Sequence, residues 1–373
     1  MTGPLAEVAA VFLRLGCGAF GGPAAHVALM RREAVEKRRW LEPQAFTDLL
    51  GACNLLPGPS STQLAMALGQ RRAGRAGLLV AGLCFLTPAA LLSAGLAWAY
   101  QRWGGLPQAQ GVLAGSRPVV LAVVAQALAS LAPTALRKPG QAAAALAALG
   151  ALLLGWPPLV ALLAGGLLLL AWTLRPPGGP LGGVVLGPLL PWAPAAGAPA
   201  RPPGLGALAA VCLKLGVVVF GSGYVLLAFL QSELVEQRHW LTPAQLFDAV
   251  AAGQLTPGPL FSTVAFIGFL LQGWAGAGVA TLAIFLPSFL MVAALGALVP
   301  RLNGSPGARA FLDGVNAAAW AAMALLSLVL GRAALGPAWA WAVALAAFLA
   351  LRRGWEPTLL MVLGALAGWA LAA

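Results

Sequence analysis

Apolar stretches long enough to cross a lipid bilayer recur along this chain, for example at residues 78–99 and 119–135. A helix needs about 20 apolar residues to span the hydrocarbon core. Only 9% of the 373 residues are charged, whereas a soluble domain of this size carries roughly 25%. Because lipid offers no hydrogen bonds to an exposed backbone, such stretches are expected to fold as helices. The sequence therefore predicts an all-α polytopic membrane protein surrounded by a lipid bilayer.

The remaining composition excludes several classes of function. The net charge of +12 comes from basic residues in short tracts between apolar segments, which is the positive-inside pattern of a membrane protein and not a nucleic-acid surface. With two His and four isolated Cys, the chain has no metal-ligand spacing. We expect no metal, no cofactor and too little acid–base machinery for an enzyme. The cysteines are predicted to be small buried side chains: Cys17, Cys53, Cys84 and Cys212.

The chain repeats itself at an offset of 200 residues. Residues 12–16 match residues 212–216, and the Pro-Gly-Pro motif (PGP) at residues 57–59 recurs at residues 257–259. Beyond the PGP motif the offset is 199, which pairs Pro88 with Pro287. The pattern predicts two homologous halves, residues 1–175 and 205–373, joined by a Pro/Gly-rich linker over residues 176–204.

The PGP segment decides the predicted topology. Proline removes a helix donor and glycine bends easily, so the segment is either a broken span or a re-entrant hairpin. If it is re-entrant, each half has five crossings, an odd number that inverts the second half, and sixteen of the 22 Lys and Arg fall on one side. If it crosses, the split is twelve to eight, so the positive-inside rule favours inversion. We expect an inverted repeat with about ten transmembrane helices.

Helix breaks are the first candidate site. Inverted repeats with broken helices are typical of secondary transporters, which bind substrate near the midplane at half-helix ends. A helix that starts after a PGP motif presents free N–H groups and hydroxyls, which attract anions. The candidate substrate-binding residues at the breaks are Gly21, Gly22, Gly221, Ser222, Pro57, Gly58, Pro59, Ser60, Ser61, Thr62, Pro257, Gly258, Pro259, Ser262 and Thr263.

Arg14 and Lys214 are cations at equivalent depth in the first segment of each half. A charge inside a span costs at least about 2.5 kcal/mol, so both are candidates for substrate binding. Two structural alternatives stay open. Each side chain could reach the interface, or each could pair with a carboxylate.

Asp48 and Asp248 also recur, just inside each PGP segment. They could carry a coupling proton, pair with Arg14 or Lys214, or cap a half-helix, and the cap is the commonest role of Asp near a helix start.

Other polar residues receive structural interpretations. Four glutamates in the amphipathic stretches are expected on a solvated interfacial face: Glu33, Glu36, Glu233 and Glu236. His26, whose counterpart is Leu226, is expected to fill a packing role. Arg117 lines an entry path or lies at an exposed helix end, and the second interpretation is favoured.

The motifs of the first half resemble, in order and spacing, the N-terminal signature of the chromate ion transporter family: residues 12–16, Phe20-Gly21-Gly22-Pro23, Arg39-Trp40-Leu41 and Leu56-Pro57-Gly58-Pro59. The second-half motifs resemble the weaker repeat of the long, two-domain members. The resemblance implies export of chromate across the cytoplasmic (inner) membrane, driven by the proton motive force, and chromate resistance. Lys214, Ser222 and Gly223 replace the Arg, Gly and Pro of the first copy, so the site is expected to be asymmetric.

Several alternatives stay open at this point. Chromate and sulfate are tetrahedral dianions of similar size, so the chain could be a carrier or a channel for sulfate or another oxyanion. An integral membrane enzyme is disfavoured because this chain has little acid–base machinery. A scaffold without transport activity is disfavoured because it would not need paired helix breaks and paired cations. For the oligomeric state, a homodimer is one alternative.

Overall fold

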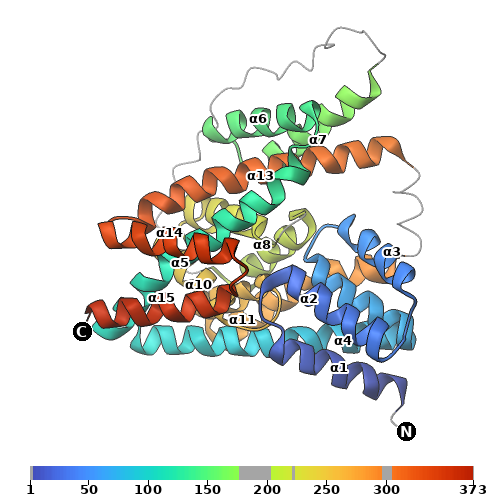
Figure 1. Cartoon of the computed structure of the whole chain (residues 1–373), viewed down its shortest axis with the longest axis horizontal. Helices are drawn as coiled ribbons and strands as arrows, with labels where there is room; N and C mark the ends of the chain where they lie inside the picture. The colour runs from blue at the N-terminus through green and yellow to red at the C-terminus, as the bar shows by residue number, and fades with distance from the viewer. Residues whose placement is uncertain (1–2, 176–202, 221–222, 296–304, 373) are drawn as a thin grey trace.

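The computed structural model describes residues 3–175, 203–220, 223–295 and 305–372, and these residues form helices without strands (Figure 1). The first half comprises α1 (Pro4–Gly18), α2 (Gly22–Arg31), the π-helix η1 (Arg32–Lys37), α3 (Pro43–Asn54), α4 (Ser60–Trp103), α5 (Pro107–Ala135), α6 (Pro139–Leu153) and α7 (Pro158–Leu174). The second half repeats this order with α8 (Leu205–Val218), α9 (Val225–Leu230), the π-helix η2 (Gln231–Gln237), α10 (Pro243–Leu255), the 3-10 helix η3 (Leu260–Ser262), α11 (Thr263–Ala293), α13 (Pro306–Ala334), α14 (Ala338–Arg352) and α15 (Pro357–Ala372).

Proline opens most of these helices, because its fixed φ suits the first turn and its missing N–H leaves no intrahelical bond unmade there. Within the described residues, four segments are long and apolar enough to cross a membrane: α4, α5, η3 with α11, and α13. The remaining apolar helices are shorter. The predicted all-α polytopic architecture is confirmed.

The PGP segment is re-entrant in both halves. α4 loses helical geometry at Ala73 and Gly74, where the φ of Gly74 is 64°. The chain reverses there so tightly that a Cβ added at Gly69 would lie 2.3 Å from the carbonyl oxygen of Gly77. α11 has the same reversal at Gln272 and Gly273. The residues before each reversal therefore lead away from the PGP turn and back to the face where the preceding helix began.

The first segment of each half, predicted as one crossing, is instead a hairpin. Arg38, after η1, donates to Glu7, near the start of α1, over 2.9 Å. Arg72, at the end of the re-entrant part of α4, binds the same carboxylate at 2.7 Å. The residues Glu7, Arg38 and Arg72 therefore lie on one face of the molecule, which we call the N-terminal face.

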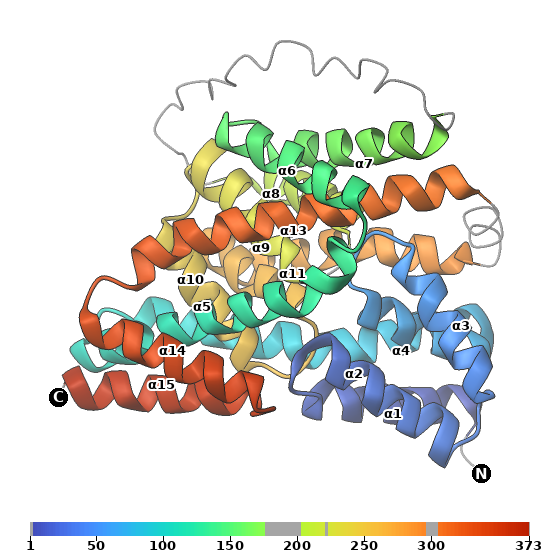
Figure 2. The same ribbon diagram turned by 45° about the horizontal axis from the view of Figure 1, so that its top comes forward.

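The second half runs antiparallel to the first. Gln101, at the far end of α4, donates to the carbonyl of Leu270, and Gln272 donates to the carbonyl of Pro203. These residues mark the opposite, C-terminal face, about 40 Å away along α4 at 1.5 Å per residue. Gly82, nearer the start of α4, packs against Phe289, so α4 and α11 run in opposite directions. Figure 2 shows the two termini at opposite ends of these helices.

The odd number of crossings expected for each half does not hold for the described helices. In the first half the hairpins, the pair α4–α5 and the pair α6–α7 each return the chain to the N-terminal face, whereas Pro203 lies at the C-terminal face. The repeat is inverted all the same, because α4 and α11 run in opposite directions. The predicted linker, residues 176–204, lies almost wholly outside the described residues.

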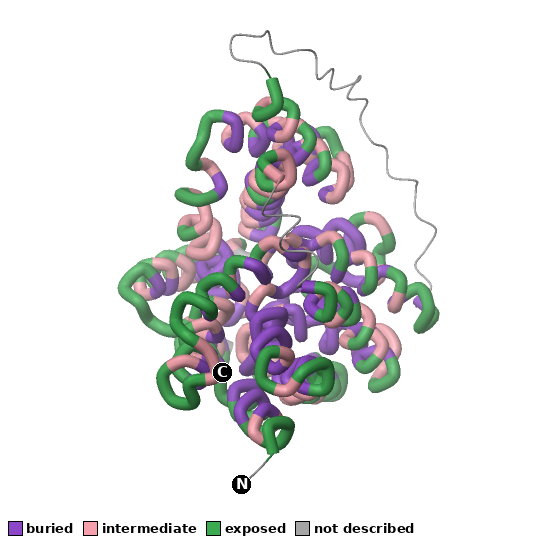
Figure 3. The backbone as a smooth tube through the Cα atoms, turned by 90° about the vertical axis from the view of Figure 1, so that its right-hand side faces the viewer, coloured by how far each residue is buried: buried purple, intermediate pink, exposed green. Residues whose placement is uncertain are grey.

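The helices form two bundles, each drawn from both halves. In the core bundle (α1–α4 and α8–α11), α4 packs against α1 and α11, and α11 packs against α8. In the outer bundle (α5–α7 and α13–α15), α13 packs against α5, α6 and α7, and α5 packs against α14 and α15. Buried segments gather at the centre of the molecule (Figure 3). A cavity lies between the two bundles and is lined by residues of both.

We predict that Arg38 and Arg238 lie on opposite faces of the membrane, because the halves are antiparallel. Single cysteines introduced at these positions in a Cys-free variant should react with a membrane-impermeant thiol reagent from opposite sides of oriented vesicles. Labelling of both from the same side would contradict the inverted repeat.

Candidate functional site

Each PGP turn is held by a backbone hydrogen bond from the other half. The Gly58 N–H donates to the carbonyl of Val219 at 2.7 Å, and the Gly258 N–H donates to the carbonyl of Ala19 at 2.9 Å. Ala19 and Val219 are the C-caps of α1 and α8. The two kinds of helix break singled out in the sequence therefore meet, crosswise, inside the core bundle.

Glycine is required in both turns. The φ of Gly58 is 109° and that of Gly258 is 104°, a region that side chains with a Cβ rarely adopt. A Cβ would lie 2.5 Å from Ser288 Oγ at the first turn and 2.8 Å from Ala89 Cβ at the second. In each case the neighbour belongs to the other half, so the close contact and the reciprocal hydrogen bonds constrain the same interface.

The first turns of the helices that follow the PGP turns contain buried polar atoms without hydrogen-bond partners. First-turn N–H groups have no intrahelical acceptor, and α4 and η3 both begin directly after a PGP turn. Four buried side-chain oxygens near these starts have no hydrogen-bond partner among the described residues: Thr62 Oγ1, Gln63 Oε1, Ser262 Oγ and Thr263 Oγ1. Since a buried polar group without a partner costs about 1–3 kcal/mol, their concentration here indicates a site that a polar ligand completes.

His26, interpreted from the sequence as a packing residue, braces the first turn. Its ring is buried, with Nε2 3.1 Å from the Ala19 carbonyl oxygen and Nδ1 3.4 Å from Ser61 Oγ. Gln63 also stabilises this turn, because its Nε2 donates a hydrogen bond to Ser288 Oγ of the second half at 3.3 Å. A search for repeated residues could not single out His26, since its counterpart is Leu226.

The first break also contains the predicted Gly21 and Gly22, whose φ values of 97° and 79° fall in the region that favours glycine. A Cβ at Gly22 would lie 3.9 Å from the Tyr224 hydroxyl of the second half. The predicted Gly221 and Ser222 lie outside the described residues.

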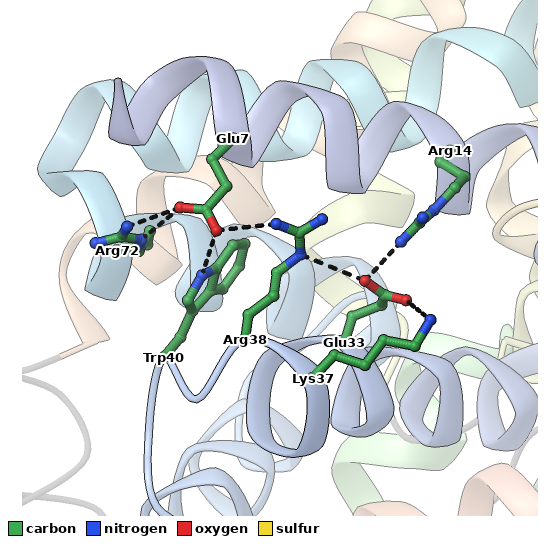
Figure 4. A network of polar contacts seen from close by, with 7 residues as sticks. All are labelled: Glu7, Arg14, Glu33, Lys37, Arg38, Trp40 and Arg72. Atoms are coloured by element: carbon green, nitrogen blue, oxygen red, sulfur yellow. Dashed lines mark hydrogen bonds and ion pairs between the residues drawn. The ribbon is translucent and has the colours of Figure 1, made fainter. Parts of the chain in front are cut away.

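The cations Arg14 and Lys214 each pair with a carboxylate, which is one of the two structural alternatives left open by the sequence. Arg14 Nη2 lies 2.5 Å from Glu33 Oε2, and Lys214 pairs with Glu233 in the equivalent position. Figure 4 shows that Arg14 and Glu33 come from the two arms of the first hairpin, with Lys37 and Arg38 beside them. These ion pairs join the two arms of each hairpin, and the Arg14 and Lys214 side chains stay about half-exposed.

The expectation of a solvated glutamate face is wrong for two of its four members. Glu33 and Glu233 have side chains only 8% and 4% exposed, because each is turned toward the cation of the other arm. Glu36 and Glu236 are exposed as expected.

The repeated aspartates differ from each other, and neither caps a helix or binds Arg14 or Lys214. Asp48 is exposed and accepts a hydrogen bond from Gln44 at 2.9 Å. Asp248 is buried, and Arg117 binds both of its oxygens at 3.1 Å. Tyr100 donates to the same carboxylate at 3.1 Å. The expected exposed helix end at Arg117 is therefore wrong: this side chain lies within α5 and is three-quarters buried.

The Arg117–Asp248 pair closes the cleft near the C-terminal face. Arg117 belongs to the outer bundle, whereas Asp248 and Tyr100 belong to the core bundle, and α10 packs against both α5 and α15. Its counterpart α3 packs chiefly against α4. On that side, toward the N-terminal face, the cleft instead contains a cavity of about 410 Å³, which reaches Pro23 and Phe220 at the breaks of the two halves.

A search of the described residues for three or more His, Cys, Asp or Glu side chains that could hold a metal ion finds no such group. The polar groups present at the crossed turns are N–H groups, hydroxyls and amides, which suit an anion bound by hydrogen bonds.

Comparison with known proteins identifies relatives along almost the whole chain. A family model described as "Chromate transporter" matches residues 6–170 and 206–369. The chromate transport protein of Cupriavidus metallidurans is 34% identical over 333 residues, covering 88% of this chain and 83% of the relative. The probable chromate transport protein of Synechococcus elongatus is 32% identical over 387 residues, covering 98% and 95%. No solved structure matches this chain.

We predict that Lys214→Ala destabilises the protein more than Arg14→Ala. Without Arg14, Glu33 keeps Lys37 at 2.8 Å and Arg38 at 3.4 Å, whereas without Lys214 Glu233 keeps only Arg238 at 3.6 Å. Breaking a buried ion pair costs up to about 3 kcal/mol or more when the carboxylate that stays behind is poorly paired, which thermal unfolding of the purified protein would detect. Adding Glu233→Gln to Lys214→Ala should recover most of the loss. Equal losses in the two single variants would contradict the ion-pair assignment.

Proposed function

The chain belongs to the chromate transporter family, and from this premise we propose that it is a secondary carrier that exports chromate across the cytoplasmic membrane, driven by the proton motive force. The observation that carries the proposal is the pair of crossed PGP turns, each with a helix start and with buried polar atoms that lack partners. Helix N-termini attract anions, and an oxyanion presents acceptors to every free N–H and hydroxyl donor around it.

The asymmetric cleft supports a carrier rather than a channel. A carrier exposes its site to one face at a time, and this cleft is closed by Arg117 and Asp248 near the C-terminal face and holds a cavity toward the other. The basic tracts at residues 31–39 and 71–75 lie on the N-terminal face, so the positive-inside rule puts that face in the cytoplasm. The cavity then opens inward, which is the state that loads a substrate for export.

The electrical part of the proton motive force favours export of a dianion directly. A potential of 100 mV, negative inside, changes the free energy of one transported charge by about 2.3 kcal/mol, and of a dianion by about 4.6 kcal/mol. A carrier that moves chromate without a compensating cation therefore gains an outward driving force before any proton is coupled.

Sulfate is the second candidate substrate. The groups at the turns are N–H donors, hydroxyls and amides, which recognise the charge and the tetrahedral oxygens of an anion and not its central atom. The same geometry therefore supports a sulfate carrier.

We predict that labelled chromate accumulates on the positive side when a potential is imposed across proteoliposomes that contain the protein, and that a pH gradient changes the rate. Parallel assays with labelled sulfate, and with each anion as competitor, rank the two substrates. Protein-free vesicles are the control. Absence of movement of either anion would overturn the proposed function, and movement of sulfate without chromate would replace chromate as the substrate.

We also predict that Thr62→Val and Thr263→Val each weaken chromate affinity about tenfold or more while leaving the protein equally or more stable. Each change removes a buried hydroxyl that has no partner, so the folded protein loses nothing, but a hydrogen bond to a charged ligand is worth about 1.5–3 kcal/mol. Thr281→Val is the matched control, because its hydroxyl already bonds to the carbonyl of Ala277. Unchanged affinity in both variants would mean that these turns are architectural.

A further inference from the structure

Arg117 and Asn316 occupy equivalent positions at the two ends of the cleft. They correspond at the offset of 199, and their helices are packed alike. Gly115 of α5 lies against the carbonyl of Gly364 in α15, and Gly314 of α13 lies in the same way against α7. Asn316 is exposed and lines the cavity toward the N-terminal face, whereas Arg117 is three-quarters buried at the closed end.

Two further pairs of equivalent residues show the same difference in exposure. Asn54 is exposed and lines the cavity, whereas its counterpart Gln254 is partly buried. Asp48 is exposed, whereas Asp248 is buried. If the bundles separated near the C-terminal face, an equivalent cavity would form there, and Arg117 would line it in the place that Asn316 has in the first cavity.

Arg117 brings a permanent positive charge to this position, because a guanidinium stays ionised in proteins. Its Nε and Nη2 donate to the two oxygens of Asp248, each over 3.1 Å. Among the described residues Arg117 is the one cation that pairs with Asp248. Separation of the bundles therefore takes the counter-ion from both side chains, and an unpaired charge at this depth is costly.

The guanidinium has donors left for a second acceptor. Arginine carries five N–H groups in a planar fork, and within the described residues Nη1 of Arg117 has no hydrogen-bond acceptor. The fork matches two oxygens of an oxyanion. An anion that reaches Arg117 can therefore bind at Nη1 while Asp248 still holds the opposite edge.

We propose that Arg117 binds the oxyanion at the C-terminal end of the cleft, and that the anion replaces Asp248 as its counter-ion when this end opens. The proposal rests on the proposed function. Opening without an anion leaves Arg117 and Asp248 both unpaired, whereas a bound dianion compensates the cation. Asp248 keeps the hydroxyl of Tyr100 as a donor and then faces the water of the opened end.

Release of the anion is the reverse exchange. When Asp248 returns to Arg117, it takes back the Nε and Nη2 donors and displaces the anion toward the C-terminal face. The same movement rejoins α5 and α10 and closes the cleft behind the anion. Because the carboxylate and the oxyanion compete for one guanidinium, loss of the Asp248 charge should strengthen anion binding, and loss of Arg117 should cancel that gain.

The test compares Asp248→Asn with the double variant Arg117→Gln/Asp248→Asn, which replaces the ion pair by two amides and leaves no buried carboxylate unpaired. Chromate affinity is measured by calorimetry on the purified full-length protein. We expect Asp248→Asn to bind chromate about tenfold or more tightly than the double variant, since a hydrogen bond to a charged group contributes that much. Thermal unfolding verifies that both variants are folded.

A flux measurement separates substrate binding from a purely structural ion pair. In proteoliposomes with an imposed potential, we expect the double variant to carry labelled chromate at about a tenth of the wild-type rate or less, although nothing then holds the C-terminal end closed by charge. Arg102→Gln is the matched control, because it removes an exposed cation at the same face and should keep the wild-type rate.

Two kinds of result overturn the inference and are distinguishable. If the double variant binds chromate as tightly as Asp248→Asn, or carries it at the wild-type rate, the ion pair only joins the bundles, and the carrier function stands. If the wild type binds neither chromate nor sulfate, the proposed function fails and the inference with it.

Discussion

The structure depends on the need to satisfy every backbone polar group away from water. A break in a helix at membrane depth exposes N–H and carbonyl groups, each of which costs several kcal/mol in hydrocarbon if it stays unpaired. Here the breaks satisfy each other across the pseudo-two-fold axis: Gly58 bonds to Val219 of the second half, and Gly258 bonds to Ala19 of the first. Neither half could bury its PGP turn alone in this way, so the inverted pairing of the halves and the central site have one physical cause.

Departures from the two-fold symmetry mark where the two faces differ. Arg117 binds Asp248 near the C-terminal face. The corresponding residues, Asn316 and Asp48, form no such pair: Asn316 carries no charge, and Asp48 is exposed and bound by Gln44. Two equivalent clefts thus end differently, one closed by a buried ion pair and one holding a cavity. Closure of the N-terminal end would therefore need contacts other than a copy of this ion pair, because Asn316 carries no charge.

How much could be predicted from the sequence depended on whether a residue recurs. The PGP turns and the paired cations were found because a chance match of rare residues at one offset is improbable, and the structure brings both turns together. His26 escaped because Leu226 stands in the corresponding position. The crossing count failed for another reason: an apolar stretch gives its length but not its direction, and the first segment, predicted as one crossing, folds back as a hairpin.

The paired cations show how a structural role follows from a costly charge. A re-entrant hairpin of two apolar arms gains little from packing them together in lipid, because lipid tails solvate apolar side chains equally well. An ion pair between the arms does not face that competition, since separating Lys214 from Glu233 would leave the buried carboxylate with Arg238 at 3.6 Å as its one remaining cation among the described residues. Fixing the arms also fixes the break between them, and the Ala19 carbonyl in that break receives the hydrogen bond from Gly258. The cations therefore act on the site through the backbone that they hold in place, and their recurrence in both halves reflects two turns that each need a fixed acceptor.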